Sequence, residues 1–357
     1  MRFWRVPAWP QCERDGSAVI LMYHSVSRIG ADPWGLRVAP RQFAEHMAVL
    51  RTHTNPIRLD ELASATVGDG TRRPVVVTFD DGYADNLLHA LPILERYRIH
   101  ATIFVATGFV GSHREYWWDD LERILLRAPR LPAEFELKMA GETHRWKLRD
   151  AVQRSAWEMW RHRHWRAWHD VRPTQRHALL LRLRELMQSS SPAECQWAMD
   201  ALRRWAGVAE AGRRTHRPLT IEQLRQLSRS PYIEIGAHTV THPSLAATSI
   251  ERQRAEIITS KTWLEEAINK PVTSFAYPFG TAQDFDAQTV NLVRQAGFQR
   301  ACTTLPGAVT AANNSFEYPR QSPLDWDGRE FLARLFKWLG CTPTPARSAY
   351  LVTTMST

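Results

Sequence analysis

The sequence predicts an α/β fold whose parallel sheet closes into a barrel. Short apolar runs alternate with amphipathic helical segments over most of the 357 residues. Strands separated by helices are typical of a parallel sheet that is covered on both faces or closed into a barrel. Two of the apolar runs end on aspartate or histidine side chains, and in barrels such groups gather at the carboxyl ends of the strands. We therefore favour the barrel.

The barrel is expected in two parts, residues 17–111 and residues 218–340. Apolar, β-branched runs predict the strands 18–26, 73–79, 100–107, 231–238, 271–280, 298–304 and 317–323. A helical spacing of apolar residues predicts the helices 39–53, 84–98, 249–269 and 287–297. We expect Pro40 to open the first of these helices, Pro92 to interrupt the second, and Ser249 to cap the third.

Residues 112–217 interrupt this alternation as an insertion. We expect the insertion to be helical and without strands, and it carries nine of the chain's 15 tryptophans and much of its net charge of +9. One segment places four rings near one face of a helix that also bears arginines: Trp157, Trp160, His164 and Trp168. We favour packing of this face onto the barrel, and contact with a membrane surface or a glycan is the alternative.

Composition argues against several classes of protein. No stretch reaches the roughly 18 apolar residues of a membrane-spanning helix, and the apolar run near the start has the form of a strand instead of a signal peptide. We expect a cytoplasmic protein, with peripheral contact at the inner face of the membrane as an option. The chain is basic, but it has no nucleic-acid motif and its positive residues are interleaved with acidic ones, so we expect no nucleic-acid partner. The four cysteines form no C-x-x-C pair and are expected to be reduced.

Two pairs of residues at strand ends are candidates for chemistry. Asp80 and Asp81 follow one predicted strand. Asp-Asp-Gly is also an ordinary turn and helix cap, but two adjacent carboxylates repel each other unless a cation or a proton is shared. His238 and His242 follow another strand, and two imidazoles at this spacing can converge on one metal ion. Because the strand ends of a barrel meet on one face, the two pairs can share a site.

Three motifs carry a resemblance to a known family. The segments TFDDG, HTVTH and FAYPFG occur in this order, each at the end of a predicted strand. They are similar to the first three motifs of the polysaccharide deacetylase family, the NodB-homology or carbohydrate esterase family 4 enzymes. The resemblance covers about residues 17–110 and 218–325. It implies a distorted (β/α) barrel of the NodB-homology type with a helical insertion, and metal-dependent hydrolysis of N-acetyl or O-acetyl groups on sugars.

The resemblance also implies roles for individual residues. Asp80 corresponds to the general base that takes a proton from water. The implied ligands of a divalent ion, which we expect to be Zn²⁺ or another first-row metal, are Asp81, His238 and His242. The implied substrate contact is a backbone N–H that holds the oxyanion, within Tyr277, Pro278 and Phe279.

Two features depart from the family pattern. Ala276 stands where many members have an arginine that orients the base, and Arg320, near another predicted strand end, is our candidate for that guanidinium, with a surface arginine as the alternative. No histidine follows His242, although the family's leaving-group acid is usually a histidine near the C-terminus.

The first predicted strand offers a replacement for this acid. Its MYH-x-V pattern resembles the branch that deacetylates poly-N-acetylglucosamine, whose barrel is circularly permuted. A strand moved from last to first in a closed barrel keeps its place, so we expect His24 to protonate the leaving amine. A buried core histidine is the alternative for His24.

These observations predict a metal-dependent carbohydrate de-N-acetylase, a hydrolase of amide bonds. We expect its substrate to be a glycan precursor, with a lipid-linked sugar as one option. The alternative is a catalytically impaired glycan-binding protein on the same barrel. The retention of the four motif residues favours the enzyme, because a binding module has no need of a base beside a metal triad.

Overall fold

The computed structural model describes residues 11–12, 17–28, 30–65, 72–139 and 141–342. Its centre is a curled sheet of parallel strands in the order β12-β11-β10-β7-β6-β2, with the short β5 also paired to β6. These strands are β2 (Val19–Tyr23), β5 (Asn55–Pro56), β6 (Pro74–Phe79), β7 (Ala101–Val105), β10 (Ile233–Ala237), β11 (Ser274–Ala276) and β12 (Arg300–Cys302). The α/β barrel architecture predicted from the sequence is thereby confirmed.

The strands are buried on both faces, as their continuous apolar runs predict. Along β6, Val75 and Val77 belong to the large core beneath the surrounding helices, whereas Val76 packs in a smaller core with Ile20 and Phe104. This alternation follows from the two-residue period of a strand. Side chains at even-numbered positions of β6 therefore face the interior of the curled sheet.

A short segment after β12 contacts both edges of the sheet. Tyr318 forms a parallel bridge with Cys302 of β12, and Gln321 forms one with Leu21 of β2. Pro319 lies between the two bridges and has no N–H to donate, so the segment pairs at single points instead of forming the strand that we predicted here. The two edge strands are thus linked through this segment.

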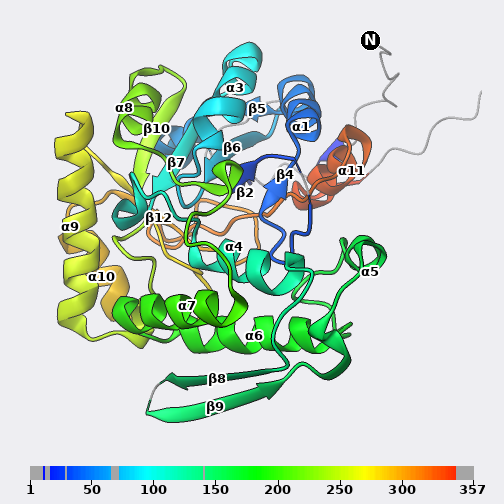
Figure 1. Cartoon of the computed structure of the whole chain (residues 1–357). Helices are drawn as coiled ribbons and strands as arrows, with labels where there is room; N and C mark the ends of the chain where they lie inside the picture. Colours follow the sequence, from blue (N-terminus) through cyan, green and yellow to red (C-terminus); the bar gives the residue numbers. More distant parts are fainter. Residues whose placement is uncertain (1–10, 13–16, 29, 66–71, 140, 343–357) are drawn as a thin grey trace, which may run out of the picture.

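Helices surround the sheet and account for the predicted alternation (Figure 1). The helices outside the insertion are α1 (Pro40–His53), α2 (Leu62–Ala65), α3 (Leu91–Tyr97), α8 (Ile221–Arg229), α9 (Ile250–Ile268), α10 (Ala287–Gln295) and α11 (Gly328–Trp338). Ser249 caps α9 by accepting a hydrogen bond from the Arg252 N–H, as predicted. Pro92 does not stop its helix, because it lies in the first turn of α3, where a missing N–H is tolerated, directly after a π-helical turn (Asn86–Ala90).

The insertion lies across one end of the barrel, in the lower part of Figure 1, and has a hydrophobic core of its own. Its elements are α4 (Trp117–Glu122), a π-helical turn (Arg123–Arg127), β8 (Glu134–Met139), β9 (Glu142–Lys147), α5 (Ala156–Arg161), α6 (Gln175–Gln188) and α7 (Pro192–Ala206). The expectation of a purely helical insertion was wrong, because β8 and β9 form an antiparallel hairpin. Alternate side chains of β8 are buried, which is the two-residue pattern of a half-exposed strand.

The Trp-rich segment does not pack as one helix on the barrel. The helix α5 ends at Arg161, and the indoles of Trp157, Trp160 and Trp168 are 60%, 59% and 56% exposed. Arginine side chains cover two of these rings, Arg161 over Trp157 and Arg163 over Trp160. Packing of this face onto the barrel, the interpretation that we favoured, was therefore wrong for Trp157 and Trp160, whereas the ring of Trp168 also lies against Gly35 of the barrel. These three exposed tryptophans are here called the Trp patch.

Two short two-stranded ladders complete the description. β1 (Gln11–Cys12) pairs with β13 (Cys341–Thr342), and β3 (Ser25–Val26) pairs with β4 (Arg37–Val38).

The cysteine side chains that the structure describes are those of Cys195 and Cys302. Both are free thiols, as predicted; the side chains of Cys12 and Cys341 lie outside the described part. Within the described ranges, no helix has the length and apolarity that crossing a membrane requires.

Candidate active site

A cavity of about 540 Å³ lies between the carboxyl ends of the barrel strands and the insertion. On the barrel side the lining includes six of the predicted site residues: His24, Asp80, Asp81, His238, His242 and Phe279. The opposite wall comes from α4 and α6 of the insertion and includes Trp117, Trp118 and Arg184. The strand ends therefore bring together residues that are far apart in the sequence, which is how parallel barrels build their sites.

The neighbouring carboxylates of Asp80 and Asp81 point to different partners. Asp80 continues the even-numbered, inward face of β6. The backbone of Asp81 has a φ of 73° and that of Gly82 a φ of 85°, so the chain turns sharply between them. This left-handed conformation is costly for a residue with a side chain, and such strain concentrates at functional sites. The turn explains how one strand end can present two carboxylates without placing them against each other.

Asp80 forms a buried ion pair with Arg320, the residue that follows Pro319 in the segment linking the sheet edges. Two parallel hydrogen bonds of 2.7 Å join the guanidinium to the two carboxylate oxygens, and both side chains are at most 1% exposed. The Arg320 Nε also donates to the Thr303 carbonyl. Burial, the largest single influence, would raise the pKa of Asp80, but the charge and hydrogen bonds of Arg320, together with the charges of His238 and His24, outweigh it and lower the pKa to about 2. Asp80 is thus held as a carboxylate. Its partner is Arg320, the residue that we predicted to orient it.

Asp81, His238 and His242 form a buried cluster whose ligand atoms all lie within 4.8 Å of one another. The Asp81 Oδ1 is 3.6 Å from Nε2 of His238 and 3.4 Å from Nε2 of His242, and it accepts no hydrogen bond from the described residues. Burial and the charge of Asp80 raise the pKa of Asp81 well above its usual range. A buried carboxylate oxygen without a donor, facing two imidazole nitrogens, fits a divalent cation.

The two histidines are held in different ways. The Nδ1 of His238 lies 2.7 Å from the carbonyl of Ala276, so a proton on Nδ1 leaves Nε2 free to bind a metal. The ring of His242 packs between Trp118 and Phe279, at centroid distances of 4.8 and 4.7 Å. Burial lowers the pKa of both imidazoles, which keeps them in the neutral form that ligates metals.

His24 lies in the same cavity, at the end of β2. Its side chain is partly buried, and the Asn86 side chain donates a hydrogen bond to its carbonyl. Burial lowers the pKa of the imidazole to about 4, while the charge of Asp80 opposes this shift. His24 is therefore placed with the other predicted site residues and is not enclosed in the core.

The three residues predicted for substrate contact do not share one position. Tyr277 is fully buried, and its hydroxyl donates to the Phe316 carbonyl, so its side chain does not reach the cavity. The Tyr277 backbone N–H donates to the carbonyl of Cys302, and Pro278 has no N–H, so neither can hold an oxyanion. Phe279, with a φ of 58°, lines the cavity beside His242. Of the three, Phe279 is the one that the structure places at the site.

The sequence did not reveal the aromatic wall contributed by the insertion. Trp118 stacks against His242, and its indole N–H donates to the Tyr83 hydroxyl. Tyr83 in turn donates to Asp119, whose carboxylate is paired with Arg37. The two adjacent tryptophans at the start of α4 are visible in the sequence and could have indicated an aromatic wall. The ion pair that anchors them could not, because Arg37 and Asp119 lie 82 positions apart.

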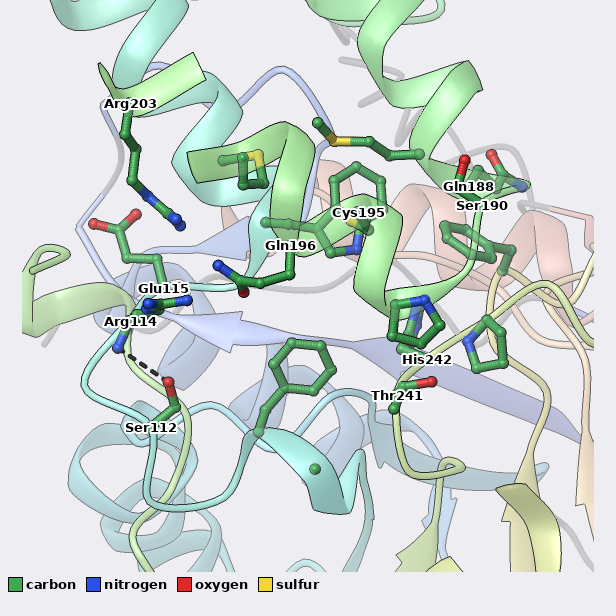
Figure 2. A pocket seen from close by; sticks show the side chains of 18 residues that line it. Ser112, Arg114, Glu115, Gln188, Ser190, Cys195, Gln196, Arg203, Thr241 and His242 are labelled. Carbon is green, nitrogen blue, oxygen red and sulfur yellow. Dashed lines mark hydrogen bonds between the residues drawn. The ribbon is translucent and has the colours of Figure 1, made fainter. Parts of the chain in front are cut away.

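A second cavity of about 370 Å³ adjoins the site on the other side of His242 and Phe279. Figure 2 shows Gln188, Ser190, Cys195 and Gln196 of the insertion around this cavity, with Thr241 and His242 from the barrel. The imidazole of His242 therefore separates two hollows, and both have one wall from the barrel and one from the insertion.

Comparisons with known proteins agree with this geometry. The sequence model of the family described as polysaccharide deacetylase matches residues 68–166 and 183–301. YxkH of Bacillus subtilis (strain 168), whose name places it among polysaccharide deacetylases, is 21% identical over 306 residues, which are 85% of this chain and 70% of YxkH.

Solved structures of low identity share the fold. The deacetylase PplD of Streptococcus pyogenes, solved with acetate, has a TM-score of 0.53 at 18% identity, covering 89% of this chain and 97% of PplD. IcaB of Ammonifex degensii has a TM-score of 0.52 at 16% identity, covering 91% of this chain and 97% of IcaB. His24 and Arg320 lie outside the residues that the family model matches. Because that model covers more than half of the sequence, this chain belongs to the polysaccharide deacetylase family.

Proposed function

We propose that this chain is a divalent-metal-dependent de-N-acetylase of a glycan precursor. The family hydrolyses the amide bonds of N-acetyl sugars. The observation that carries the metal dependence is the buried Asp81 Oδ1, which has no hydrogen-bond donor in the described part of the chain and faces two imidazole nitrogens. Zn²⁺ suits a donor set of one carboxylate and two imidazoles.

The chain's own residues supply the proton transfers. A cation held by Asp81, His238 and His242 would polarise the acetyl carbonyl and lower the pKa of water. Asp80 accepts the proton of the attacking water, and Arg320 fixes the carboxylate in one orientation through its two hydrogen bonds. The Phe279 N–H makes no hydrogen bond to the described residues, and among the three predicted positions it is the donor left for the oxyanion.

We assign the leaving-group acid to His24. An amine departs poorly without a proton, so an acid must lie in the same cavity as the base. The His24 ring is neutral near pH 7, since its pKa is lowered to about 4. A neutral ring must gain a proton before it can act as an acid, so the proton that Asp80 takes from water would pass to His24 and then to the amine, which returns Asp80 to the carboxylate and His24 to its neutral form. The position of His24 beside Asp80 in the cavity supports this role.

Metal retention and activity test the proposed function together. Replacing His238 or His242 by Ala should abolish both the bound metal and deacetylation of N-acetylated sugars, because two ligands do not hold the ion tightly. Elemental analysis of dialysed protein measures the first effect, and acetate release from a panel of free and lipid-linked N-acetyl sugars measures the second. The control His164→Ala alters an exposed histidine of the insertion. Unchanged metal content in both ligand variants would remove the assignment, and wild-type protein that binds sugars without releasing acetate would favour the impaired, glycan-binding alternative.

A substrate comparison tests His24. We expect His24→Ala to keep its metal and its fold, to lose most activity on a sugar amide, and to hydrolyse 4-nitrophenyl acetate nearly as well as the wild type. The reason is that nitrophenolate leaves without a proton whereas an amine does not. Steady-state rates on both substrates provide the measurement. Equal losses on the two substrates would show that His24 is not the acid.

We also propose that the Trp patch contacts an anionic membrane surface and that the sugar is lipid-linked. Trp168 belongs both to the exposed Trp patch and to the lining of the main cavity, so the patch reaches the mouth of the site. Arginines over exposed indoles suit the headgroup region of an anionic bilayer. The cytoplasmic location expected from the sequence remains a prediction.

Vesicle binding tests this contact. The protein should co-sediment with anionic vesicles and not with neutral ones, and salt should weaken the binding, since the attraction is partly electrostatic. The variant Trp157→Ala/Trp160→Ala should lose it. Trp197→Ala is the matched control, because this tryptophan is 47% exposed on α7, outside the Trp patch. Binding that is equal for both vesicle types would rule out the anionic surface as the partner.

A further inference from the structure

One charged side chain of the insertion faces the main cavity without a hydrogen-bond or ion-pair partner among the described residues. Arg184 of α6 lines this cavity, and its guanidinium carbon lies 5.4 Å from the ring centre of Trp34 and 5.9 Å from that of Phe279. Both rings make cation–π contacts with it. Among the described residues, none forms a hydrogen bond or an ion pair with this guanidinium, although it is partly buried.

The acids near the cavity have hydrogen-bond or ion-pair partners other than Arg184. Asp80 is paired with Arg320, and Glu185 is paired with Arg182 at 3.1 Å. Asp284, an acid whose charge acts on Arg184, accepts hydrogen bonds from other side chains: Ser244, Thr281 and Gln188. The carboxylate of Asp81 belongs to the predicted metal triad. Arg184 thus has no direct ion-pair partner among the described residues, although the charge of Asp284 acts on it from a distance, and Arg172 adds a second arginine to the same lining.

An unpaired guanidinium in a partly dry cavity is electrostatically unfavourable. Burial lowers the pKa of Arg184, against the opposing charges of Asp284 and Glu185. An anion placed against the guanidinium would offset this desolvation, and phosphate and carboxylate oxygens match its planar fork of donors. The cation–π contacts of Arg184 with two rings restrict the fork before a ligand arrives, which reduces the entropy lost on binding.

From these contacts we infer that the site takes an N-acetylated sugar that carries a phosphate or diphosphate group, and that Arg184 binds this group. The inference rests on the proposed function and adds the substrate class. Phe279 contacts both Arg184 and His242. A sugar whose acetyl group lies at the metal triad would therefore extend its neighbouring substituent across Phe279 toward Arg184. A nucleotide diphosphate and a lipid diphosphate present the same group.

Binding of non-hydrolysable products tests the inference without turnover. Calorimetry on the metal-loaded full chain would compare glucosamine 1-phosphate with methyl glucosaminide, which differ in the anionic group. We expect the phosphate to bind at least about 10-fold more tightly, as charge-assisted hydrogen bonds to a guanidinium would give, and this preference should fall with added salt. Arg184→Gln should remove the preference, and Arg184→Lys should restore part of it. Uridine diphosphate glucosamine and a polyprenyl diphosphate glucosamine in detergent would then distinguish the two sources of phosphate.

Arg204→Gln is the matched control, because it removes one exposed arginine of α7 that lines neither cavity. It should leave the preference unchanged. The Arg184 side chain forms no hydrogen bond with the residues that the structure describes, so thermal unfolding of Arg184→Gln should be close to that of the wild type. Equal affinity of the wild type for both ligands, no binding of either, or a preference that survives Arg184→Gln would overturn the inference. The proposed function fails separately, if no N-acetylated sugar, phosphorylated or neutral, releases acetate or if the release does not depend on the metal.

Discussion

Replacing Asp80 by Asn is expected to lower deacetylation by roughly 10²- to 10⁴-fold, the usual contribution of a general base. The amide cannot accept the proton of the attacking water. The bound metal should remain, because Asp81, His238 and His242 are unchanged and Asp80 points to Arg320 instead. Rates on an N-acetylated sugar, together with elemental analysis of the same preparation, give both quantities.

Comparing Asp80→Asn with Asp81→Asn separates the role of the base from that of the metal ligand. Asp81→Asn should lose the metal together with the activity, since it removes the charged ligand of the triad. Asp60→Asn, a change at an exposed residue paired with Arg58, should affect neither quantity. Wild-type rates in Asp80→Asn would show that the base lies elsewhere, and loss of metal in that variant would reverse the roles of the two aspartates.

Replacing Arg320 by Met is expected to destabilise the protein by about 3–5 kcal/mol, the usual effect of removing one partner of a buried ion pair. Asp80 would be left as a buried carboxylate without its counter-charge. Activity should also fall, because the base loses the two hydrogen bonds that orient it. Denaturant unfolding monitored at neutral pH measures the first effect.

The pH dependence of this loss has a definite sign. In the wild type the pKa of Asp80 is lowered from 3.8 to about 2, so the stabilisation from the pair is complete above pH 3.8 and disappears as the pH falls toward 2. The difference in unfolding free energy between wild type and Arg320→Met should therefore shrink over this range. Arg41→Met, which alters an arginine that is 84% exposed, should change stability by less than about 1 kcal/mol at any pH. A similar small change in Arg320→Met would mean that the pair contributes little.

The sequence predicted most strands of the barrel correctly, but it mispredicted the segment 317–323 and the strands of the insertion. Continuous apolar runs such as β6 specify a strand buried on both faces, whatever surrounds them. The segment 317–323 has similar composition, but Pro319 limits it to isolated bridges. The hairpin of β8 and β9 was missed because one charged residue alternates with one apolar residue over a short stretch, and the high charge of the region outweighed that pattern.

The positions of the candidate site residues followed from motif order, while their surroundings did not. Asp80, His238 and His242 stand where parallel strands end, and a barrel brings such ends together. The candidate Arg320 does pair with Asp80, as expected from its place near a predicted strand end. Nothing local indicates that an arginine of α6 lies against Phe279. That contact depends on the packing of the insertion against the barrel, which a single sequence does not encode in any visible period.

The ion pair of Asp80 and Arg320 also constrains when the site can form during synthesis. The two residues are 240 positions apart, and the segment that carries Arg320 is the one that links β12 to β2. Contacts of such long separation slow folding, because a large loop must close before they form. Until that segment leaves the ribosome, both outer strands of the sheet have unpaired edges open to wrong partners. A nascent chain that ends before Arg320 already contains the complete predicted metal triad. The carboxylate of Asp80, however, still lacks the guanidinium that pairs with it in the folded protein.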